Sequence, residues 1–435
     1  MNMREMKDSG IEWIGKIPSD WTVSKITHIL DLTHPYAIGD GDHGIIKADD
    51  YTDDGIPYIR VNNLGWATEL QLSNVVYITQ QQNELIKSST LKPDDILFAK
   101  TGATIGKTAI IPKSVAIANT TSHVGKISVS REHCAKFFYY VLSSYIGYKQ
   151  FWDFASLKTT RPELSIDEIK QTILISPTSY AEQKAISDHL DLKCKECDTL
   201  VIDIQSQIET LEEYKRSVIT EAVTKGLDPD VEMRDSGVQW IGEIPTPWTL
   251  IRIGSLYGLR TQKVSDIDYP PLSVTKMGVL PQLDTVAKTN AHDDRKLVVK
   301  GDFVINSRSD RRGSCGISDY TGSVSLINTV LFPITEMNPR YYNWYFHTVG
   351  FADEFYRWGH GIVDDLWTTG WHDMKNILIS VPSLDEQQRI ADYLDSKCAE
   401  IDNIITEKKQ QIETIEEYKK SLIFEYVTGK KEVQA

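Results

Sequence analysis

The chain has 435 residues, 41% of them hydrophobic and 25% charged, which is ordinary for a globular protein of about three domains. No apolar run approaches the roughly 18 residues that a membrane span needs, and residues 1–20 do not resemble a signal peptide. The five cysteines are sparse and odd in number, which argues against a disulfide framework. These features exclude a membrane protein or a disulfide-rich secreted protein, and they predict a cytoplasmic location.

The net charge of −14 would disfavour DNA binding if it were spread evenly. However, residues 22–176 hold 15 Lys+Arg and 16 Asp+Glu, residues 249–381 hold 14 of each, and the remaining −13 lies outside these two blocks. Two nearly neutral blocks permit a local basic face on each, although they do not demonstrate one.

A repeated segment opens each half of the chain. Residues 8–21 read DSGIEWIGKIPSDW and residues 235–248 read DSGVQWIGEIPTPW. A repeat of this kind reports the architecture, so the two halves are expected to share one plan. Four tryptophans recur in the same context, and we interpret them as packing anchors: Trp13, Trp21, Trp240 and Trp248.

A variable block follows each repeat. Both blocks mix short β-rich runs with a late aromatic helix, at 137–152 and 341–356, so each is expected to be a compact α+β domain. The blocks align faintly. KPDDILFAKTGATIGKTAI (92–110) matches VKGDFVINSRSDRRGSCGI (299–317), Asn119-Thr120 recurs as Asn328-Thr329, and TILISP (172–177) resembles ILISVP (377–382). This pattern predicts a shared fold with different surfaces. In this fold Asp95 is equivalent to Asp302, and Gly106 is equivalent to Gly313.

A long amphipathic helix closes each half. EQKAISDHLDLKC (182–194) recurs as EQQRIADYLDSKC (386–398). Ser179-x-x-Glu182 and Ser383-x-x-Glu386 have the spacing of capping boxes, and Gly226 and Gly429 are placed as C-terminal caps. About 44 helical residues at roughly 1.5 Å each would span about 66 Å.

Apolar residues at 3–4 spacing in both helices indicate a coiled-coil seam, interrupted by Lys215 and Lys408. A helix this long cannot bury its apolar stripe alone, so the near-identical helix of the other half is the expected mate. A pseudo-twofold between the halves makes the pair antiparallel. The predicted helix-pair core is Val201, Ile204, Ile208, Leu211, Val218, Ile401, Ile405, Ile412, Ile415 and Leu422.

The predicted fold class is therefore α+β, with two α+β domains joined by a pair of long antiparallel coiled-coil helices in a pseudo-twofold internal repeat. The expected boundaries are 1–178 for the first domain, 179–226 for the first helix, 227–382 for the second domain, 383–429 for the second helix and 430–435 for a tail.

Motifs that would carry catalysis are incomplete. Gly102 to Thr108 resembles a phosphate-binding loop but has one residue too few between its glycines, so a turn between two strands is predicted. Cys194-x-x-Cys197 lacks the second ligand pair of a zinc site, and core packing is favoured. There is no HExxH, GxSxG or GxGxxG. We therefore expect no catalytic residue, no metal site and no cofactor in this chain.

Basic, polar and aromatic residues of the blocks are the candidates for DNA contacts. Arginine can bind guanine edges with two hydrogen bonds, and lysine and threonine suit phosphates. The alternative interpretation is a pair of solvated turns. The candidates in the first block are Lys100, Thr101, Lys107, Lys158, Thr159 and Arg161, and those in the second are Asn306, Arg308, Arg311, Arg312, Trp358 and His360.

Two copies of DSGxxWIGxIPxxW, two dissimilar blocks and two copies of an EQxxI…LD…EEYKxS helix, of which the second reads PxxxEQxxI…LD…EEYKxSLI, resemble the specificity subunit of type I restriction–modification systems. The resemblance covers essentially the whole chain. It implies that each block is a target recognition domain reading one half of an asymmetric, bipartite DNA site. It also implies that the helices set the spacer and dock two methyltransferase subunits, which use S-adenosylmethionine to methylate adenine at N6. Motor–nuclease subunits would add reactions that depend on ATP and Mg²⁺.

Two other classes stay open at this point. One is a coiled-coil adaptor that never touches nucleic acid, and the other is a self-contained methyltransferase or nuclease. Within the resemblance, a chain that serves a modification-only system has the same sequence features.

Overall fold

The computed structural model describes residues 4–157, 162–282, 293–361 and 367–433. It divides into two compact units, and each long helix contributes to both. Unit 1 comprises residues 1–205 and 409–435, and unit 2 comprises residues 206–408. Each unit therefore contains one variable block, the start of one long helix and the end of the other.

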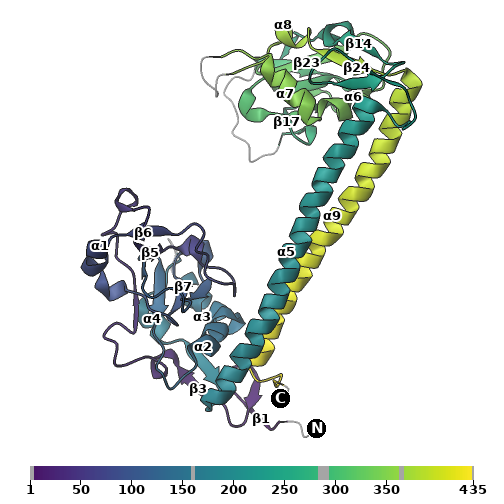
Figure 1. Ribbon diagram of the computed structural model, residues 1–435. Coiled ribbons are helices and arrows are strands. Elements are labelled where there is room, and N and C mark those ends of the chain that lie inside the picture. Colours follow the sequence, from purple (N-terminus) through teal and green to yellow (C-terminus); the bar gives the residue numbers. More distant parts are fainter. Residues whose placement is uncertain (1–3, 158–161, 283–292, 362–366, 434–435) are drawn as a thin grey trace. The chain divides into compact units, whose positions relative to one another are not determined.

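Helix α5 (Tyr180–Lys225) and helix α9 (Leu384–Val427) are the long helices (Figure 1). The other helices of unit 1 are α1 (Gln80–Leu85), α2 (Ala135–Ser143), α3 (Tyr145–Ser156) and α4 (Ile166–Lys170). Its strands are β1 (Met6–Asp8), β2 (Lys16–Pro18), β3 (Thr22–Lys25), β4 (Ile38–Asp40), β5 (Ile56–Ile59), β6 (Val76–Ile78), β7 (Ile96–Ala99), β8 (Thr108–Ile110), β9 (Asn119–Thr120), β10 (Val124–Ile127) and β11 (Ile173–Ser176).

Unit 2 has the shorter helices α6 (Pro339–Phe346), α7 (Val349–Arg357) and α8 (Trp371–Met374). Its strands are β12 (Met233–Asp235), β13 (Glu243–Pro245), β14 (Thr249–Arg252), β15 (Tyr257–Leu259), β16 (Lys263–Val264), β17 (Leu272–Thr275), β18 (Gly278–Pro281), β19 (Arg295–Val298), β20 (Phe303–Asn306), β21 (Cys315–Ile317), β22 (Gly322–Ser325), β23 (Asn328–Pro333) and β24 (Leu378–Val381).

The two blocks share a central antiparallel sheet. Its strand order is β4-β10-β7-β8 in the first block and β15-β23-β20-β21 in the second. Aromatic side chains of the following helices cover one face: the rings of Phe98 and Phe151 lie 5.3 Å apart, and those of Phe303 and Phe346 lie 4.4 Å apart. The predicted α+β class and the common fold of the blocks are confirmed.

One alignment made from the sequence is wrong. Asn119 lies in β9, which runs parallel to β5, whereas Asn328 lies in β23 and pairs with Asn306 of the central strand β20. The residue that occupies the place of Asn328 is Val124, which pairs with Ala99 of β7. A two-residue polar match is too short to identify equivalent strands.

The long helices pack antiparallel in each unit. In unit 1, Lys419 donates to Asp198 at 2.6 Å, and in unit 2 the equivalent Lys215 donates to Asp402 at 2.7 Å. Lys408, the other seam lysine, donates to Gln207. Lysines that seemed to interrupt the seam thus form polar contacts across it.

The predicted seam residues lie along these contacts. Ile208, Val218, Ile401, Ile405 and Leu422 are buried, and Cys194 and Cys197 are buried in α5, in agreement with core packing. The other five are half-buried: Val201, Ile204, Leu211, Ile412 and Ile415. No helix in the described part of the chain is long and apolar enough to cross a membrane.

A buried tryptophan joins the helix ends in each unit. The indole of Trp21, with no exposed surface, donates to Glu182 at the start of α5 at 3.1 Å. Trp248 donates in the same way to Glu386 at the start of α9, at 3.0 Å. The glutamates that the sequence placed in capping boxes therefore bind the repeated tryptophans.

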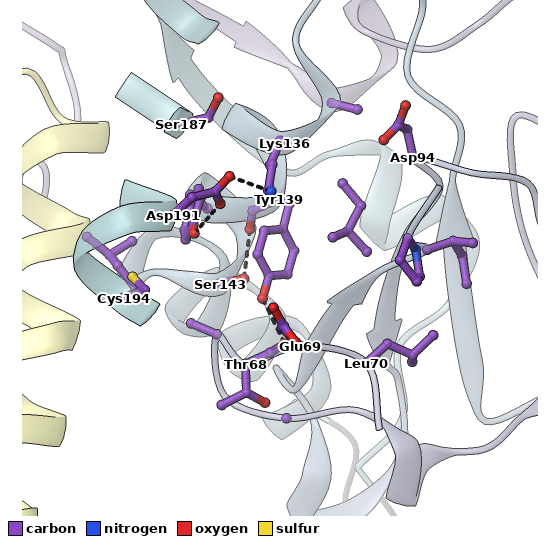
Figure 2. A pocket seen from close by; sticks show the side chains of 18 of the residues that line it. Thr68, Glu69, Leu70, Asp94, Lys136, Tyr139, Ser143, Ser187, Asp191 and Cys194 are labelled. Atoms are coloured by element: carbon purple, nitrogen blue, oxygen red, sulfur yellow. Dashed lines mark hydrogen bonds and ion pairs between the residues drawn. The ribbon is translucent and has the colours of Figure 1, made fainter. Parts of the chain in front are cut away.

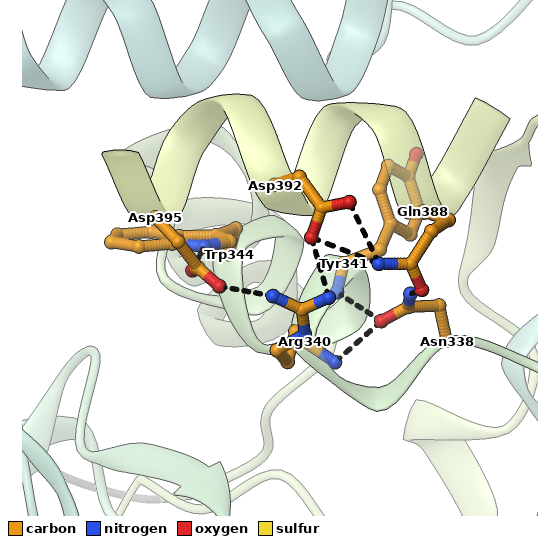
Figure 3. Close-up of polar contacts among 7 residues, drawn as sticks. All are labelled: Asn338, Arg340, Tyr341, Trp344, Gln388, Asp392 and Asp395. Carbon is orange, nitrogen blue, oxygen red and sulfur yellow. Dashed lines mark hydrogen bonds and ion pairs between the residues drawn. The ribbon is translucent and has the colours of Figure 1, made fainter. Parts of the chain in front are cut away.

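A second set of contacts attaches each block to its helix. In unit 1, Lys136 and Tyr140 of α2 both bind Asp191 of α5; Figure 2 shows Lys136 and Asp191 pointing toward each other. In unit 2, the equivalent Arg340 and Trp344 of α6 bind Asp395 of α9 at 2.6 and 2.8 Å (Figure 3). Both blocks are therefore held on their helices through the same positions.

Gly429 follows the end of α9 and lies against Trp21, so its substitution tests the junction that Trp21 forms between the ends of the two long helices. Gly429 has φ +68°, and an added Cβ would lie 2.4 Å from Pro18 and 3.2 Å from Trp21. Gly429→Ala is expected to destabilise the protein by about 1–2 kcal/mol for the left-handed backbone, and by about 1–3 kcal/mol more for overpacking. Thermal or urea unfolding measures the change.

Gly10 supplies the matched control, because its φ is +76° and nothing lies within 4 Å of an added Cβ. Gly10→Ala should show only the backbone cost. Equal destabilisation by the two variants would mean that Gly429 does not depend on the contact with Trp21.

Candidate nucleic-acid interface

The candidate site is a turn that each block builds in the same way between two strands of its central sheet. In the first block, the turn between β7 and β8 contains the short 3-10 helix Gly102–Thr104, and in the second the turn between β20 and β21 contains Ser309–Arg311. The turns close through equivalent backbone hydrogen bonds, from Ala99 to Lys107 and from Asn306 to Ser314. The segment that resembled a phosphate loop is thus a turn, as predicted.

The equivalent glycines make these turns possible. Gly106 has φ +92° and Gly313 has φ +73°, a region that disfavours residues with a Cβ. The predicted pairing of Gly106 with Gly313 is confirmed.

A buried aspartate supports the start of each central strand. Asp95 accepts from the Lys92 amide and Asp302 accepts from the Val299 amide, so their predicted equivalence is confirmed. Burial raises the pKa of the Asp95 carboxyl. Asp302 has a different partner, since Arg260 donates to it at 2.6 and 2.8 Å. The two blocks thus share the same strand and its supporting aspartate, whereas the charged residues around that aspartate differ.

A second segment lies beside each turn. The backbone of Thr101 forms an isolated antiparallel bridge with that of Glu163. The backbones of Arg308 and Thr368 form the equivalent bridge in the second block. Thr368 in turn pairs with His360, so the structure brings together the two groups of candidates in the second block. Lys158, Thr159 and Arg161 lie outside the described residues.

The arginines of the second block lie on the surface beside carboxylates. Arg308 Nε lies 3.1 Å from Asp310, and Arg311, whose side chain is 66% exposed, lies 3.6 Å from the same residue. Arg312 stacks over the Tyr356 ring at 3.8 Å and binds Asp353 at 3.0 Å. These exposed ion pairs are weak, so phosphates or bases can replace the carboxylates.

The other candidates of the second block have mixed positions. Asn306 accepts from the Arg308 amide and therefore shapes the turn. Trp358 donates to Glu354 at 2.8 Å and packs against the core. His360 is exposed and lies 3.4 Å from Asp373. His360 thus extends the arginine surface, whereas Asn306 and Trp358 support it.

In the first block, two predicted contact residues are buried. Lys100 is only 4% exposed and its ammonium binds Asp40. Thr101 is buried, with its hydroxyl 3.3 Å from His123. Lys107 is half-buried. A buried lysine that is paired with a carboxylate is poorly placed to reach a phosphate.

The exposed groups around this turn were not singled out from the sequence. They are Glu163, His43 and His123. One signal was available for Glu163: continuing the TILISP and ILISVP match backwards pairs Glu163 with Thr368. Asp40 and His43 gave no such signal, because they lie in and after an edge strand that has no repeated sequence.

A groove of about 2260 Å³ lies elsewhere in unit 1, between the block and the helices (Figure 2). Three lysines of its lining form ion pairs: Lys136 with Asp191, Lys184 with Asp188 and Lys419 with Asp198. Among the described residues, no group of three or more His, Cys, Asp or Glu side chains is arranged to hold a metal ion.

Two α+β domains share one sheet arrangement, carry different side chains at equivalent turns and are joined to paired long helices, so the chain presents two different surfaces on one fold. The profile of the type I restriction modification DNA specificity domain matches residues 18–210 and 247–414. The chain belongs to this family.

The chain is also similar in sequence to two type I restriction enzyme specificity subunits. The chain is 23% identical over 432 residues to the putative type I restriction enzyme MjaX specificity subunit of Methanocaldococcus jannaschii, covering 96% of this chain and 95% of that one. It is 24% identical over 208 residues to the EcoBI specificity subunit of Escherichia coli, covering 47% of this chain and 42% of that one.

The fold is similar to a chain solved in work on complex assembly and conformational transition of the type I R-M system, with a TM-score of 0.68, 13% identity and coverage of 94% and 98% of the two chains. It is also similar to the HsdS subunit of Thermoanaerobacter tengcongensis, with a TM-score of 0.51, 14% identity and coverage of 95% and 98%.

The arginine turn generates a prediction. Arg308→Ala, and separately Arg312→Ala, should weaken specific DNA binding by the assembled complex by about 1–3 kcal/mol if the arginine contacts a guanine edge. An arginine that contacts only phosphate would instead lower the salt dependence and leave specificity unchanged. Titrations of cognate and noncognate duplexes at several salt concentrations separate these cases. Wild-type affinity and specificity in both variants would exclude this turn from the interface.

Proposed function

We propose that this chain is the DNA sequence-specificity subunit of a type I restriction–modification complex, and that each block reads one half of a bipartite, asymmetric site. The observation that carries the proposal is the pair of equivalent turns with different side chains. Positions 101 and 163 hold Thr and Glu, where positions 308 and 368 hold Arg and Thr. One frame with two sets of side chains suits two half-sites of different sequence.

The paired helices are proposed to set the spacer between half-sites and to dock two adenine-N6 methyltransferase subunits, through which motor–nuclease subunits join. Duplication supports equivalent docking: Tyr214 and Tyr418 follow the same paired glutamates in α5 and α9, and both are about half exposed. The acidic character of the helices suits protein docking better than contact with phosphates.

The chain itself is proposed to be non-catalytic. The methyltransferase subunits would bind S-adenosylmethionine, and the motor–nuclease subunits would use ATP and Mg²⁺. A coiled-coil adaptor is the second candidate, favoured by the long helix pair. Salt-sensitive duplex binding by the assembled complex excludes that candidate.

Exchange of one block tests the independence of the two readers. Replacing residues 22–176 with a related block should change one half-site and leave the other half-site and the spacer unchanged, because the repeats and helices that hold the block remain. Mapping N6-methyladenine across the genome of cells that carry the variant with its methyltransferase reads both half-sites at once. Alteration of both half-sites, or of neither, would contradict two independent readers.

Helix length tests the spacer. Both ends of each long helix are held at tryptophan junctions, so an insertion after Gln205 is best matched by one after Lys409, the equivalent position of α9. Four added residues extend each helix by about 6 Å, or about two base pairs, and rotate the seam little. We expect a longer spacer with both half-sites unchanged.

A matched two-residue insertion is the control. It rotates the apolar stripe by about 200° and should disrupt the helix pair, which circular dichroism and thermal unfolding would detect. A stable, active four-residue variant that keeps the original spacer would show that the helices do not set the distance.

A further inference from the structure

Equivalent positions at the two turns carry side chains of different charge. In the second block, Arg308 is exposed and its backbone pairs with that of Thr368. In the first block, Thr101 replaces the arginine and is buried, and Glu163 replaces the threonine with a side chain that is 51% exposed. The first block thus presents a hydrogen-bond acceptor where the second presents donors.

Glu163 is held in place by the turn. The Leu164 amide donates to the Lys100 carbonyl at 2.8 Å, and the Gly102 amide donates to the Pro162 carbonyl at 2.9 Å. These bonds on both sides of Glu163 attach its backbone to the turn. A base contact needs a side chain on such a rigid frame.

Lys100 supplies a counter-charge beneath the carboxylate. Its buried ammonium binds Asp40 and lies 3.7 Å from Glu163 Oε1. Asp40 also lies 3.1 Å from exposed His43. Lys100 thus acts as a positioning residue that offsets part of the negative charge at this surface, rather than as a contact to DNA.

An exposed carboxylate is repelled by phosphates, so its favourable partner in DNA is an amino group on a base edge. In the major groove, cytosine presents the N4 amino donor, whereas adenine presents its N6 amino group beside the N7 acceptor. A carboxylate accepts hydrogen bonds and donates none, so N7 would repel its second oxygen. Cytosine is therefore the better match.

We propose that Glu163 is a specificity-determining residue that accepts a hydrogen bond from the N4 amino group of a cytosine in the half-site read by the first block. This inference rests on the proposed function and adds the chemistry of one recognised base. It predicts readers of opposite character, with a carboxylate in the first block and arginines in the second.

Glu163→Gln is the direct test, made in the full chain assembled with its methyltransferase subunits. A glutamine amide both donates and accepts, which suits adenine N6 and N7. We expect methylation of the cognate site to fall by about tenfold or more, with the preference at one position moving from cytosine toward adenine. The other half-site should not change. Genome-wide mapping of N6-methyladenine and methylation rates on duplexes that vary at that position give the readout.

Glu132→Gln is the matched control, because Glu132 is an exposed acid of the same block. It follows the end of β10 at Ile127, whereas the start of β10 at Val124 pairs with Ala99 beside the turn. This variant should leave sequence preference unchanged. Thermal unfolding of both variants checks that the fold is intact.

Three results would overturn the inference: no cytosine in the wild-type half-site assigned to the first block, an unchanged preference in E163Q, or a uniform loss of methylation without a shift in preference. Each of these leaves two independent half-sites in place, so the proposed function would survive. A wild-type complex that yields no bipartite motif would instead overturn the proposed function together with this inference.

Discussion

Three segments that are far apart in the sequence meet at one buried tryptophan in each unit, and the architecture depends on this junction. In unit 1, Trp21 of the opening repeat donates to Glu182 at the start of α5 and lies against Gly429 at the end of α9. In unit 2, Trp248, Glu386 and Gly226 make the same arrangement. A buried indole contributes a large apolar surface and requires a partner for its N–H. Because the start of one helix meets the end of the other at this residue, the helices must run antiparallel.

Polar contacts along the helices then restrict their register. Lys419 is largely buried and binds Asp198, and Lys215 makes the equivalent bond to Asp402. Removing Asp198 would leave the largely buried charge of Lys419 without its partner, whereas an apolar seam alone tolerates sliding by a turn. Lys215 and Asp402 are more exposed, so the loss of one of them would cost less. Such pairs contribute more to the choice of one register than to net stability. A single register is what helices that measure a DNA spacer would require.

The turn surfaces of the two blocks combine the same strands and turn with different exposed side chains. Asp95 and Asp302 support the same strand, and Gly106 and Gly313 permit the same turn. The exposed side chains that surround the turns differ in charge and in hydrogen-bonding capacity. Because the strands, the buried aspartates and the turn glycines determine the fold, substitutions of exposed residues at the turn surface cost little stability. This separation would allow one chain to carry the two different readers that we propose.

The sequence by itself determined the repeat, the α+β class, the paired helices and the family, because hydrophobic periodicity and duplicated motifs are local signals. It also predicted the turn that carries the arginines of the second block, and contact of these arginines with DNA stays a prediction. It did not reveal that Glu182 and Glu386 bind tryptophans, or that Lys215 crosses the seam to Asp402, since each partner lies far away in the chain. Lys100 shows the limit most clearly. In sequence it is a basic residue in a polar turn, and only the tertiary structure brings Asp40 from another strand to bury and neutralise it. Burial and pairing decide whether a charge faces a ligand or supports the fold, and both depend on residues that are not neighbours in the sequence.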